Sequence, residues 1–388
     1  MKARLLITGA GTAATSNLIR SLRASADSLF IVGAHSDRFF LRKSSADANY
    51  LLPDLTHPRF FPALRRVLAR EKVELLIPTT DAEVRALVRP RRRLPCRLFL
   101  PRESVVDLCQ DKYRLNARLR SCGVPVPVTH PVSRLGAIDK IFRRLAGHQR
   151  VWCRIRVGSG SMGAIPVKRA EQAKSWIAYW GEMRGVPATA FTLSEFLPGR
   201  DFSCQALWKE GELILTKTCE RLSYFGGGAQ PSGISSVSQL AKTVCEPRVV
   251  EVCTAAIRAL DRRASGTFNF DLRENARGVP CITEINVGRF ASGTNVYDLT
   301  GKHNLAALFV RVALGHRVDL HEEYDAAEGY YTVRDLDTLT GVFRTDDLFD
   351  RIVDAREQSA IPGFTTTQGG TSCPSNHRSR KARRAASC

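Results

Sequence analysis

The sequence predicts an α/β protein with a doubly wound parallel sheet at the N-terminus and a β-rich α+β region after it. Short apolar segments alternate with amphipathic helical segments over residues 1–100, and this βαβ rhythm is typical of parallel sheets with helices on both faces. From residue 151 onward, strand patterns predominate. A length of 388 residues with 44% hydrophobic content suggests two or three packed units.

The N-terminal elements follow from short apolar runs and from helical periodicity. Strands are expected at Leu5–Thr8, Leu29–Gly33, Leu75–Pro78 and Arg97–Leu100, with helices such as Thr12–Leu22 and Arg59–Arg70 between them. The turn at Gly9–Thr12 is a weak match to a phosphate-binding loop, and a plain strand-to-helix turn explains it equally well. The first apolar run is too short for a signal peptide, and no run approaches the roughly 20 residues of a membrane helix. We expect a cytoplasmic protein.

The second region begins after a helix at Asp111–Arg120, where Gly123 and a Pro-punctuated segment mark a domain boundary. Expected strands are Val151–Arg156, Ala164–Lys168, Thr189–Phe196, Asp201–Trp208, Glu212–Thr218, Thr267–Arg273 and Val279–Ile285, the last two forming a hairpin. A polar, Gly-rich loop is expected at Tyr224–Ser238, and helices at Val244–Arg263 and Lys302–Leu314. From about Thr365 the composition predicts disorder.

Composition excludes some classes of function. None of the 11 cysteines forms a Cys-x-x-Cys pair, which argues against a zinc site and favours reduced, buried thiols. The net charge is +20, with a cluster of arginines at Arg89, Arg91, Arg92, Arg93, Arg97 and Arg102 and a basic tail at residues 365–388. A nucleic-acid-associated protein is one interpretation, but the chain has no standard nucleic-acid motif, and a solvated basic surface explains the charge better.

A glycine-rich loop is the first feature that carries chemistry. Gly158, Ser159, Gly160, Ser161, Met162 and Gly163 follow one another between two strand patterns. Such a loop offers backbone N–H groups to phosphate oxygens, since glycine permits close approach and positive φ. Arg154 and Arg156 precede it two residues apart, and therefore share one face of their strand. The segment predicts phosphate binding.

Carboxylates gather on the predicted hairpin. Strand alternation places Asn269 and Asp271 on one face, and Glu284 and Asn286 on the same face of the partner strand. Hard oxygen ligands without His or Cys describe a magnesium site that substrate phosphates complete. Arg289 follows and can reach the same phosphate. Polar pairs on a solvated face are the structural alternative.

These segments resemble the ATP-grasp superfamily. Residues 151–163 look like its cation-plus-glycine-loop motif, and residues 281–289 resemble its Glu-x-Asn-(Pro)-Arg motif. By pattern, the chain is most similar to the synthetase halves of carbamoyl-phosphate synthase and to the carboxylate–amine ligases, over roughly residues 1–320. The resemblance implies a Rossmann-like pre-ATP-grasp domain at 1–110 and an ATP-grasp domain at 111–320, divided into subdomains at 111–198 and 199–320. A C-terminal extension at 321–364 and a disordered basic tail at 365–388 complete the division.

The resemblance also implies roles for individual residues. Nucleotide contacts are expected from Lys112, Arg154, Gly158, Ser159, Gly160, Ser161, Gly163, Glu195, Phe196, Leu197 and Asp201, with Asp201 in place of the family's glutamate. Magnesium, or Mn²⁺ in its place, would be held by Asp271, Glu284 and Asn286. Arg289 and Arg154 would be catalytic, although Gly288 is inserted before Arg289 relative to the family pattern.

The implied activity is ATP- and Mg-dependent ligation of a small-molecule carboxylate to an amine or ammonia through an acyl phosphate, with release of ADP and phosphate. The glycine loop and the segment Arg221–Ser238 are candidate lids. The oligomeric state stays open, and the resemblance makes a homodimer one option. A carbamoyl-phosphate-synthase-like synthetase half is an alternative. A nucleotide-dependent oxidoreductase would instead use the turn at Gly9–Thr12. We expect neither membrane nor nucleic-acid partners.

Overall fold

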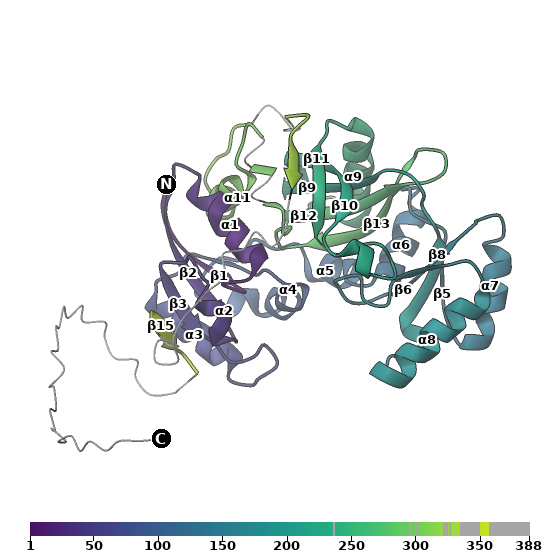
Figure 1. Ribbon diagram of the computed structural model, residues 1–388. Helices are drawn as coiled ribbons and strands as arrows, with labels where there is room; N and C mark the ends of the chain where they lie inside the picture. Colours follow the sequence, from purple (N-terminus) through teal and green to yellow (C-terminus); the bar gives the residue numbers. More distant parts are fainter. Residues whose placement is uncertain are drawn as a thin grey trace, which may run out of the picture. The chain divides into compact units, whose positions relative to one another are not determined.

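The computed structural model describes residues 1–235, 237–294, 297–298, 301–320, 325, 327–333 and 350–356. The expected disorder from Thr365 onward lies outside the described residues. Three sheets organise the described part of the chain (Figure 1). Its helices are α1 (Ala13–Arg23), α2 (Arg38–Leu41), α3 (Phe60–Arg70), α4 (Asp81–Val88), α5 (Glu103–Cys109), α6 (Lys112–Ser121), α7 (Ile138–Arg144), α8 (Ala170–Arg184), α9 (Pro247–Leu260) and α11 (Leu305–Ala313). None of these helices combines the length and the apolar composition that a membrane crossing requires.

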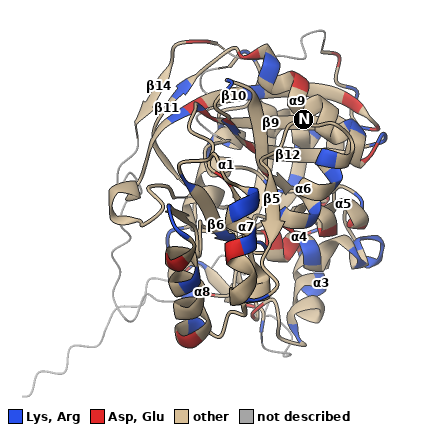
Figure 2. Cartoon of the chain, turned by 90° about the vertical axis from the view of Figure 1, so that its right-hand side faces the viewer, with Lys and Arg blue, Asp and Glu red and all other residues tan. Residues whose placement is uncertain are grey.

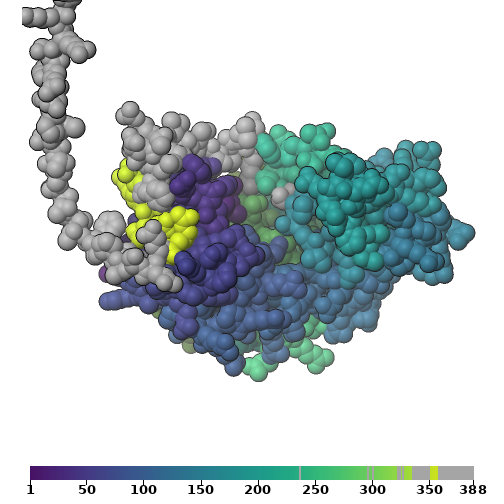
Figure 3. Space-filling view, turned by 90° about the horizontal axis from the view of Figure 1, so that it is seen from below, coloured from purple at the N-terminus to yellow at the C-terminus, as the bar shows by residue number. Residues whose placement is uncertain are grey.

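The first sheet is parallel and has the strand order β15-β3-β2-β1-β4. Its strands are β1 (Lys2–Thr8), β2 (Ser28–His35), β3 (Ala48–Leu51), β4 (Leu75–Ile77) and β15 (Ile352–Asp354). Alternation along β1 buries Leu5 and Ile7 against α1 and α11, and Leu6 against α3. Helices therefore cover both faces, which confirms the doubly wound arrangement. Figure 3 shows β15, in yellow, beside the purple N-terminal segment.

The second sheet is antiparallel, with the order β5-β8-β6-β7. Its strands are β5 (Thr129–Pro131), β6 (Val151–Ile155), β7 (Ile165–Val167) and β8 (Phe191–Glu195). On β6, Val151 and Cys153 pack with α7 and α8 in one hydrophobic cluster. Because side chains alternate along a strand, Trp152 and Arg154 point to the opposite face.

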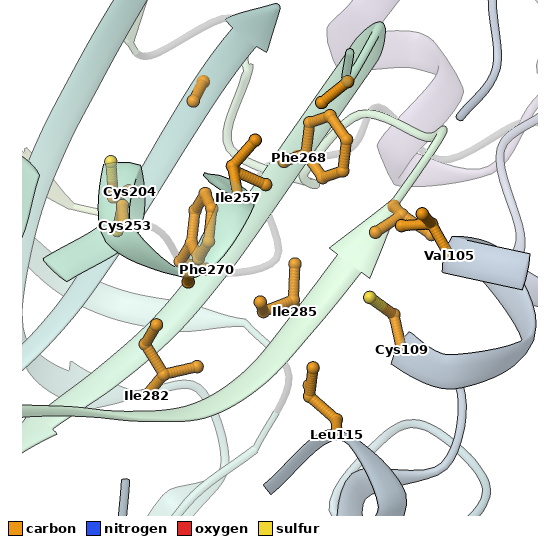
Figure 4. Packing of buried hydrophobic residues seen from close by; sticks show 14 of the residues in the cluster. Val105, Cys109, Leu115, Cys204, Cys253, Ile257, Phe268, Phe270, Ile282 and Ile285 are labelled. Atoms are coloured by element: carbon orange, nitrogen blue, oxygen red, sulfur yellow. The ribbon is translucent and has the colours of Figure 1, made fainter. Parts of the chain in front are cut away.

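The third sheet has the order β13-β12-β9-β10-β11-β14 and is antiparallel. Its strands are β9 (Asp201–Lys209), β10 (Glu212–Tyr224), β11 (Ser238–Thr243), β12 (Gly266–Glu274), β13 (Pro280–Val287) and β14 (Tyr331–Val333). One face packs Phe268, Phe270 and Ile285 against α5, α6 and α9 (Figure 4). The other face carries the predicted metal ligands, so the core on one side positions the polar residues on the other.

Several expected elements differ from the structure. The expected strand Arg97–Leu100 is reduced to one isolated bridge between Arg97 and Leu75. β10 extends to Tyr224 and so takes in the start of the expected Gly-rich loop, where a short 3-10 helix lies at Gly227–Ala229. The strand expected from Thr189 begins at Phe191, because residues 188–190 form a 3-10 turn. Pairing with other strands sets the first two boundaries, and a local 3-10 turn sets the third.

Candidate active site

A cavity of about 460 Å³ is lined by the polar faces of the second and third sheets and by the turn between β4 and α4. Every predicted site residue lines it except Gly163. Gly163 instead ends the glycine loop, and its carbonyl accepts a 3.0 Å hydrogen bond from the Trp176 indole of α8. A Cβ atom at this glycine would lie 2.7 Å from the Ile155 side chain, so close packing favours glycine here.

The glycine loop crosses the cavity with an unusual backbone. Gly158 and Gly160 have φ values of 136° and 72°, and Ser161 also has a positive φ of 57°. Lys112, at the start of α6, bonds the carbonyl of Gly158 at 2.5 Å, and its ammonium lies 3.3 Å from the Glu284 carboxylate. Asp111 caps α6 by accepting from the backbone N–H of Arg114, which fixes the position of Lys112. Lys112 therefore joins the loop to the hairpin.

Arg154 points from β6 into the cavity. Its Nη2 donates a 2.7 Å hydrogen bond to the carbonyl of Thr283 on β13. Its Nε is buried and has no hydrogen-bond partner in the described structure. Burial lowers the pKa of the guanidinium, and the nearby charges of Glu284 and Asp271 only partly offset this effect. A buried, unpartnered N–H costs free energy, so this atom is suited to an anionic ligand.

The hairpin brings the predicted metal ligands together as alternation predicts. Asp271 lies directly opposite Glu284, and Asn269 opposite Asn286. A bulge follows at Thr283, whose hydroxyl donates to the Asp271 carbonyl at 3.0 Å. The Asn286 amide donates to the Asp271 carboxylate at 3.4 Å. Among the described residues, no group of three or more His, Cys, Asp or Glu side chains is arranged to hold a metal ion. The hairpin instead brings together two carboxylates and two amide side chains.

A cationic side chain contacts each of the three predicted metal ligands. Lys112 lies beside Glu284, Arg221 bonds Asp271 at 2.6 Å, and Arg289 donates to the Asn286 amide oxygen at 2.7 Å. The pKa of Arg221 lies well above its ordinary value. Burial by itself would lower this pKa, but the negative charges of Asp271 and Asp201 outweigh that effect. The ligands are therefore held in place and charge-compensated within the protein.

Arg289 is fixed by Asp81, which lies just after β4 of the parallel sheet. Its Nε and Nη2 bond the two oxygens of Asp81 at 2.6 and 3.1 Å. Asp81 opens α4, whose N-cap Thr80 forms a reciprocal capping box with Glu83. Burial acts to lower the pKa of Arg289, but hydrogen bonding to Asp81 and its charge raise it overall. The inserted Gly288, with a φ of 71°, turns the chain so that Arg289 lies beside Asn286.

The cavity lining also includes apolar residues beside further carboxylates. Leu197 is buried, and Phe196 lies near Trp152 with ring centroids 6.2 Å apart. The Glu195 carboxylate accepts from the Val128 backbone at 2.9 Å and lies 3.5 Å from His148. Both carboxylate oxygens of Asp201 also have protein partners, Arg221 at 2.8 Å and the Tyr224 hydroxyl at 2.7 Å.

Sequence reasoning missed three residues of this site. Asp81 follows the end of β4, where ligands collect in parallel sheets, and that edge rule could have indicated it. Arg221 enters the sequence analysis only as the first residue of a candidate lid, yet its side chain is 14% exposed and lines the cavity. Trp152 lies two residues before Arg154, so strand alternation already placed both on one face.

The structure gives the oxidoreductase alternative no support. At Gly11 a Cβ atom would lie 1.7 Å from the carbonyl oxygen of Phe40, so close packing against α2 already explains glycine at this turn. The arginine cluster is largely engaged in internal contacts. Arg89 pairs with Glu103, Arg91 donates to the carbonyls of Leu100 and Pro101 at 3.0 Å, and Arg102 pairs with Asp261 at 3.3 Å. In Figure 2, Lys and Arg are spread over several helices and interspersed with acids.

Comparison with solved structures identifies the fold of this chain. No family model matches the sequence, and no curated protein matches it. Solved structures do match. An L-amino acid ligase from Bacillus licheniformis superimposes with a TM-score of 0.61 at 13% identity, covering 81% of this chain and 74% of that one.

Two further solved structures are similar to this chain. The biotin carboxylase domain of a 2-oxoglutarate carboxylase from Hydrogenobacter thermophilus, in complex with MgADP, ADP and bicarbonate, gives a TM-score of 0.65 at 13% identity, covering 85% and 73% of the two chains. N5-carboxyaminoimidazole ribonucleotide synthetase from Thermus thermophilus gives 0.60 at 16% identity, covering 83% and 80%. The chain therefore has the ATP-grasp fold that its motifs resemble.

Proposed function

We propose that this protein is an ATP- and Mg-dependent ligase that activates a carboxylate as an acyl phosphate and joins it to an amine or ammonia, releasing ADP and phosphate. The observation that carries the proposal is the pairing of Arg154, whose buried Nε has no partner, with the oxygen ligands of the hairpin across one cavity. The structural neighbours include an L-amino acid ligase and a carboxylase domain with bound MgADP.

The residues present fit a metal–triphosphate complex. Two carboxylates and an amide oxygen are ligands that Mg²⁺ prefers when phosphates complete its coordination, and Mn²⁺ accepts the same set. When bound, the cation neutralises phosphate charge and orients the reacting oxygens. Asp271, Glu284 and Asn286 would hold it. Lys112, Arg154 and the N–H groups of the glycine loop would bind the phosphates.

The remaining contacts follow the same reasoning. The adenine would lie beside Phe196 and Leu197, with the hinge held by Glu195, and the ribose near Asp201. Because the Asp201 oxygens are already bonded by Arg221 and Tyr224, ribose hydroxyls would share them rather than find them free. Gly163 would contribute through the shape of the loop.

The chemistry is a sequence of two displacements. A carboxylate oxygen attacks the γ-phosphorus and the bond to the β–γ bridging oxygen breaks, which releases ADP. An amine nitrogen then attacks the acyl carbon, the bond to the phosphate oxygen breaks, and a proton is lost from nitrogen. Arg289, held by Asp81 beside Asn286, stabilises the negative charge of the transferring phosphoryl group. No protein nucleophile is required.

The test is product analysis with a matched pair of variants. Purified protein is incubated with ATP, Mg²⁺ and pools of carboxylates and amines, and ADP and phosphate are measured. We expect both, in equal amounts with the ligated product, and no turnover for Glu284→Ala. Glu212→Ala, which removes an exposed carboxylate from β10 of the same sheet, should retain activity.

Other products would contradict the proposal. Release of AMP and pyrophosphate would indicate adenylation, and near-normal turnover by Glu284→Ala would remove the metal assignment. Consumption of two ATP per product with bicarbonate and ammonia would favour the carbamoyl-phosphate-synthase-like alternative.

A further inference from the structure

Arg221 lines the cavity, but the reaction scheme above gives this residue no role. It lies on β10, two residues after Cys219, and Cys219, Ser203 and Asp271 form one ladder row across β10, β9 and β12. Its guanidinium bonds Asp201 at 2.8 Å on one side and Asp271 at 2.6 Å on the other, and donates to the Phe202 carbonyl at 3.0 Å. One cation therefore joins the expected ribose end to the expected metal end.

The guanidinium is fixed on several sides. Its side chain is 14% exposed, and the Tyr224 ring lies 5.6 Å from its central carbon. The Tyr224 hydroxyl bonds the second oxygen of Asp201 at 2.7 Å, which fixes that carboxylate in turn. A planar fork of donors can bond two separate carboxylates at once, whereas a lysine ammonium is a single point charge. An arginine at position 221 can therefore hold the carboxylates of Asp201 and Asp271 at fixed positions.

We propose that Arg221 is a positioning residue that holds Asp271 and makes divalent-cation binding depend on the nucleotide. The inference rests on the metal site of the proposed function. A free cation that approaches Asp271 meets the guanidinium already bonded to the same carboxylate, with Lys112 beside Glu284 and Arg289 beside Asn286. Like charges at such distances repel strongly in a partly buried site.

A triphosphate reverses this balance because it brings several negative charges to the same place. The cation then binds together with the nucleotide, and Arg221 keeps Asp271 in position for it. Removing Arg221 removes one of the three compensating cations and leaves Asp201 and Asp271 facing the cavity without their shared partner. A cation should then bind to the nucleotide-free variant more tightly than it binds to the nucleotide-free wild type.

The test measures Mn²⁺ binding to the nucleotide-free protein by electron paramagnetic resonance of the free ion. Wild-type protein should bind Mn²⁺ weakly and tighten its binding when ADP is added. Arg221→Met should bind Mn²⁺ without nucleotide at least about tenfold more tightly than wild type, and lose most of the ADP dependence. Arg221→Lys, which keeps the charge but cannot bond both acids, should lie between the two.

Arg273→Met is the matched control. Arg273, on β12, lies opposite Asp201 of β9, and its guanidinium is 3.9 Å from the Asp201 carboxylate. Among the described residues, the hydrogen bonds and ion pairs of Arg273 include none to Asp271. Arg273→Met removes the same single positive charge as Arg221→Met. If the position of that charge matters rather than the net charge, the Mn²⁺ affinity of Arg273→Met should stay within about twofold of wild type. Thermal unfolding checks that each variant is folded, and Arg221→Lys serves if Arg221→Met is not.

Two results overturn the inference: Mn²⁺ binding by Arg221→Met that equals wild type, or an equal gain in Arg221→Met and Arg273→Met. Failure of the proposed function is distinguishable, because the readout needs no substrate and no turnover. A protein that joins no carboxylate to any amine could still show the Arg221 effect, and an active ligase could lack it.

Discussion

Replacing Arg154 with methionine tests the nucleotide site without knowledge of the substrates. The variant keeps an unbranched apolar stem but removes the buried Nε that has no protein partner. A hydrogen bond to a charged group contributes about 1.5–3 kcal/mol, so loss of one or two phosphate contacts should cost about 3 kcal/mol, or about 150-fold in Kd. Isothermal titration of Mg²⁺ with ADP or a non-hydrolysable ATP analogue measures it.

Two controls separate phosphate binding from structural damage. Adenosine has no phosphates, so its affinity should be equal in wild type and Arg154→Met if only phosphate contacts are lost. Arg154→Lys, which restores the cation usual in the resembling family, should recover most of the nucleotide affinity. A Kd for ADP within about threefold of wild type in folded Arg154→Met would refute the reasoning, because one or two charged hydrogen bonds cannot be lost at so small a cost.

Three further predictions follow from contacts in the structure. Asp81→Asn should lower kcat by about 10²–10³ with a smaller change in KM for ATP, since it loosens Arg289 beside the transferring group; a steady-state rate within about threefold of wild type would contradict this. Lys217 is 2% exposed and lies between the buried carboxylates of Asp298 and Asp325. Lys217→Met should therefore lower the free energy of unfolding, measured by urea denaturation, by about 3–5 kcal/mol. A decrease in that free energy of less than about 1 kcal/mol would be inconsistent with a buried ion cluster. Burial raises the pKa of Cys281 to about 11, so at about pH 8 iodoacetamide should label the exposed Cys122 and Cys245 well before Cys281, and peptide mass spectrometry showing the reverse order would contradict the burial.

Much of the site could be predicted because strand alternation is a local rule. The side chains of Asp271 and Asn269 must share a face, and the hairpin places Glu284 and Asn286 opposite them whatever the rest of the fold does. The same rule placed Arg154 on the cavity side of β6. The roles assigned to these residues stay proposals until nucleotide binding is measured.

Other features depend on pairing between distant segments, which no local pattern reveals. β15 pairs with β3 in the first sheet although about 300 residues separate them in sequence. β14 is the edge strand of the third sheet, next to β11. Asp81 reaches Arg289 across 208 positions of sequence. Arg221 looks like a surface residue in sequence, because only the pairing of β10 with β9 brings it between two acids. The proposed domain boundaries near residues 110 and 198 also stay predictions.

The most direct test of the account is a crystal structure with Mg²⁺ and a non-hydrolysable ATP analogue. The account predicts the phosphates between the Nε of Arg154 and the oxygens of Glu284 and Asn286, with the glycine loop over them and the adenine beside Phe196. A nucleotide bound at the Gly9–Thr12 turn, or phosphates with no contact to the hairpin, would contradict it.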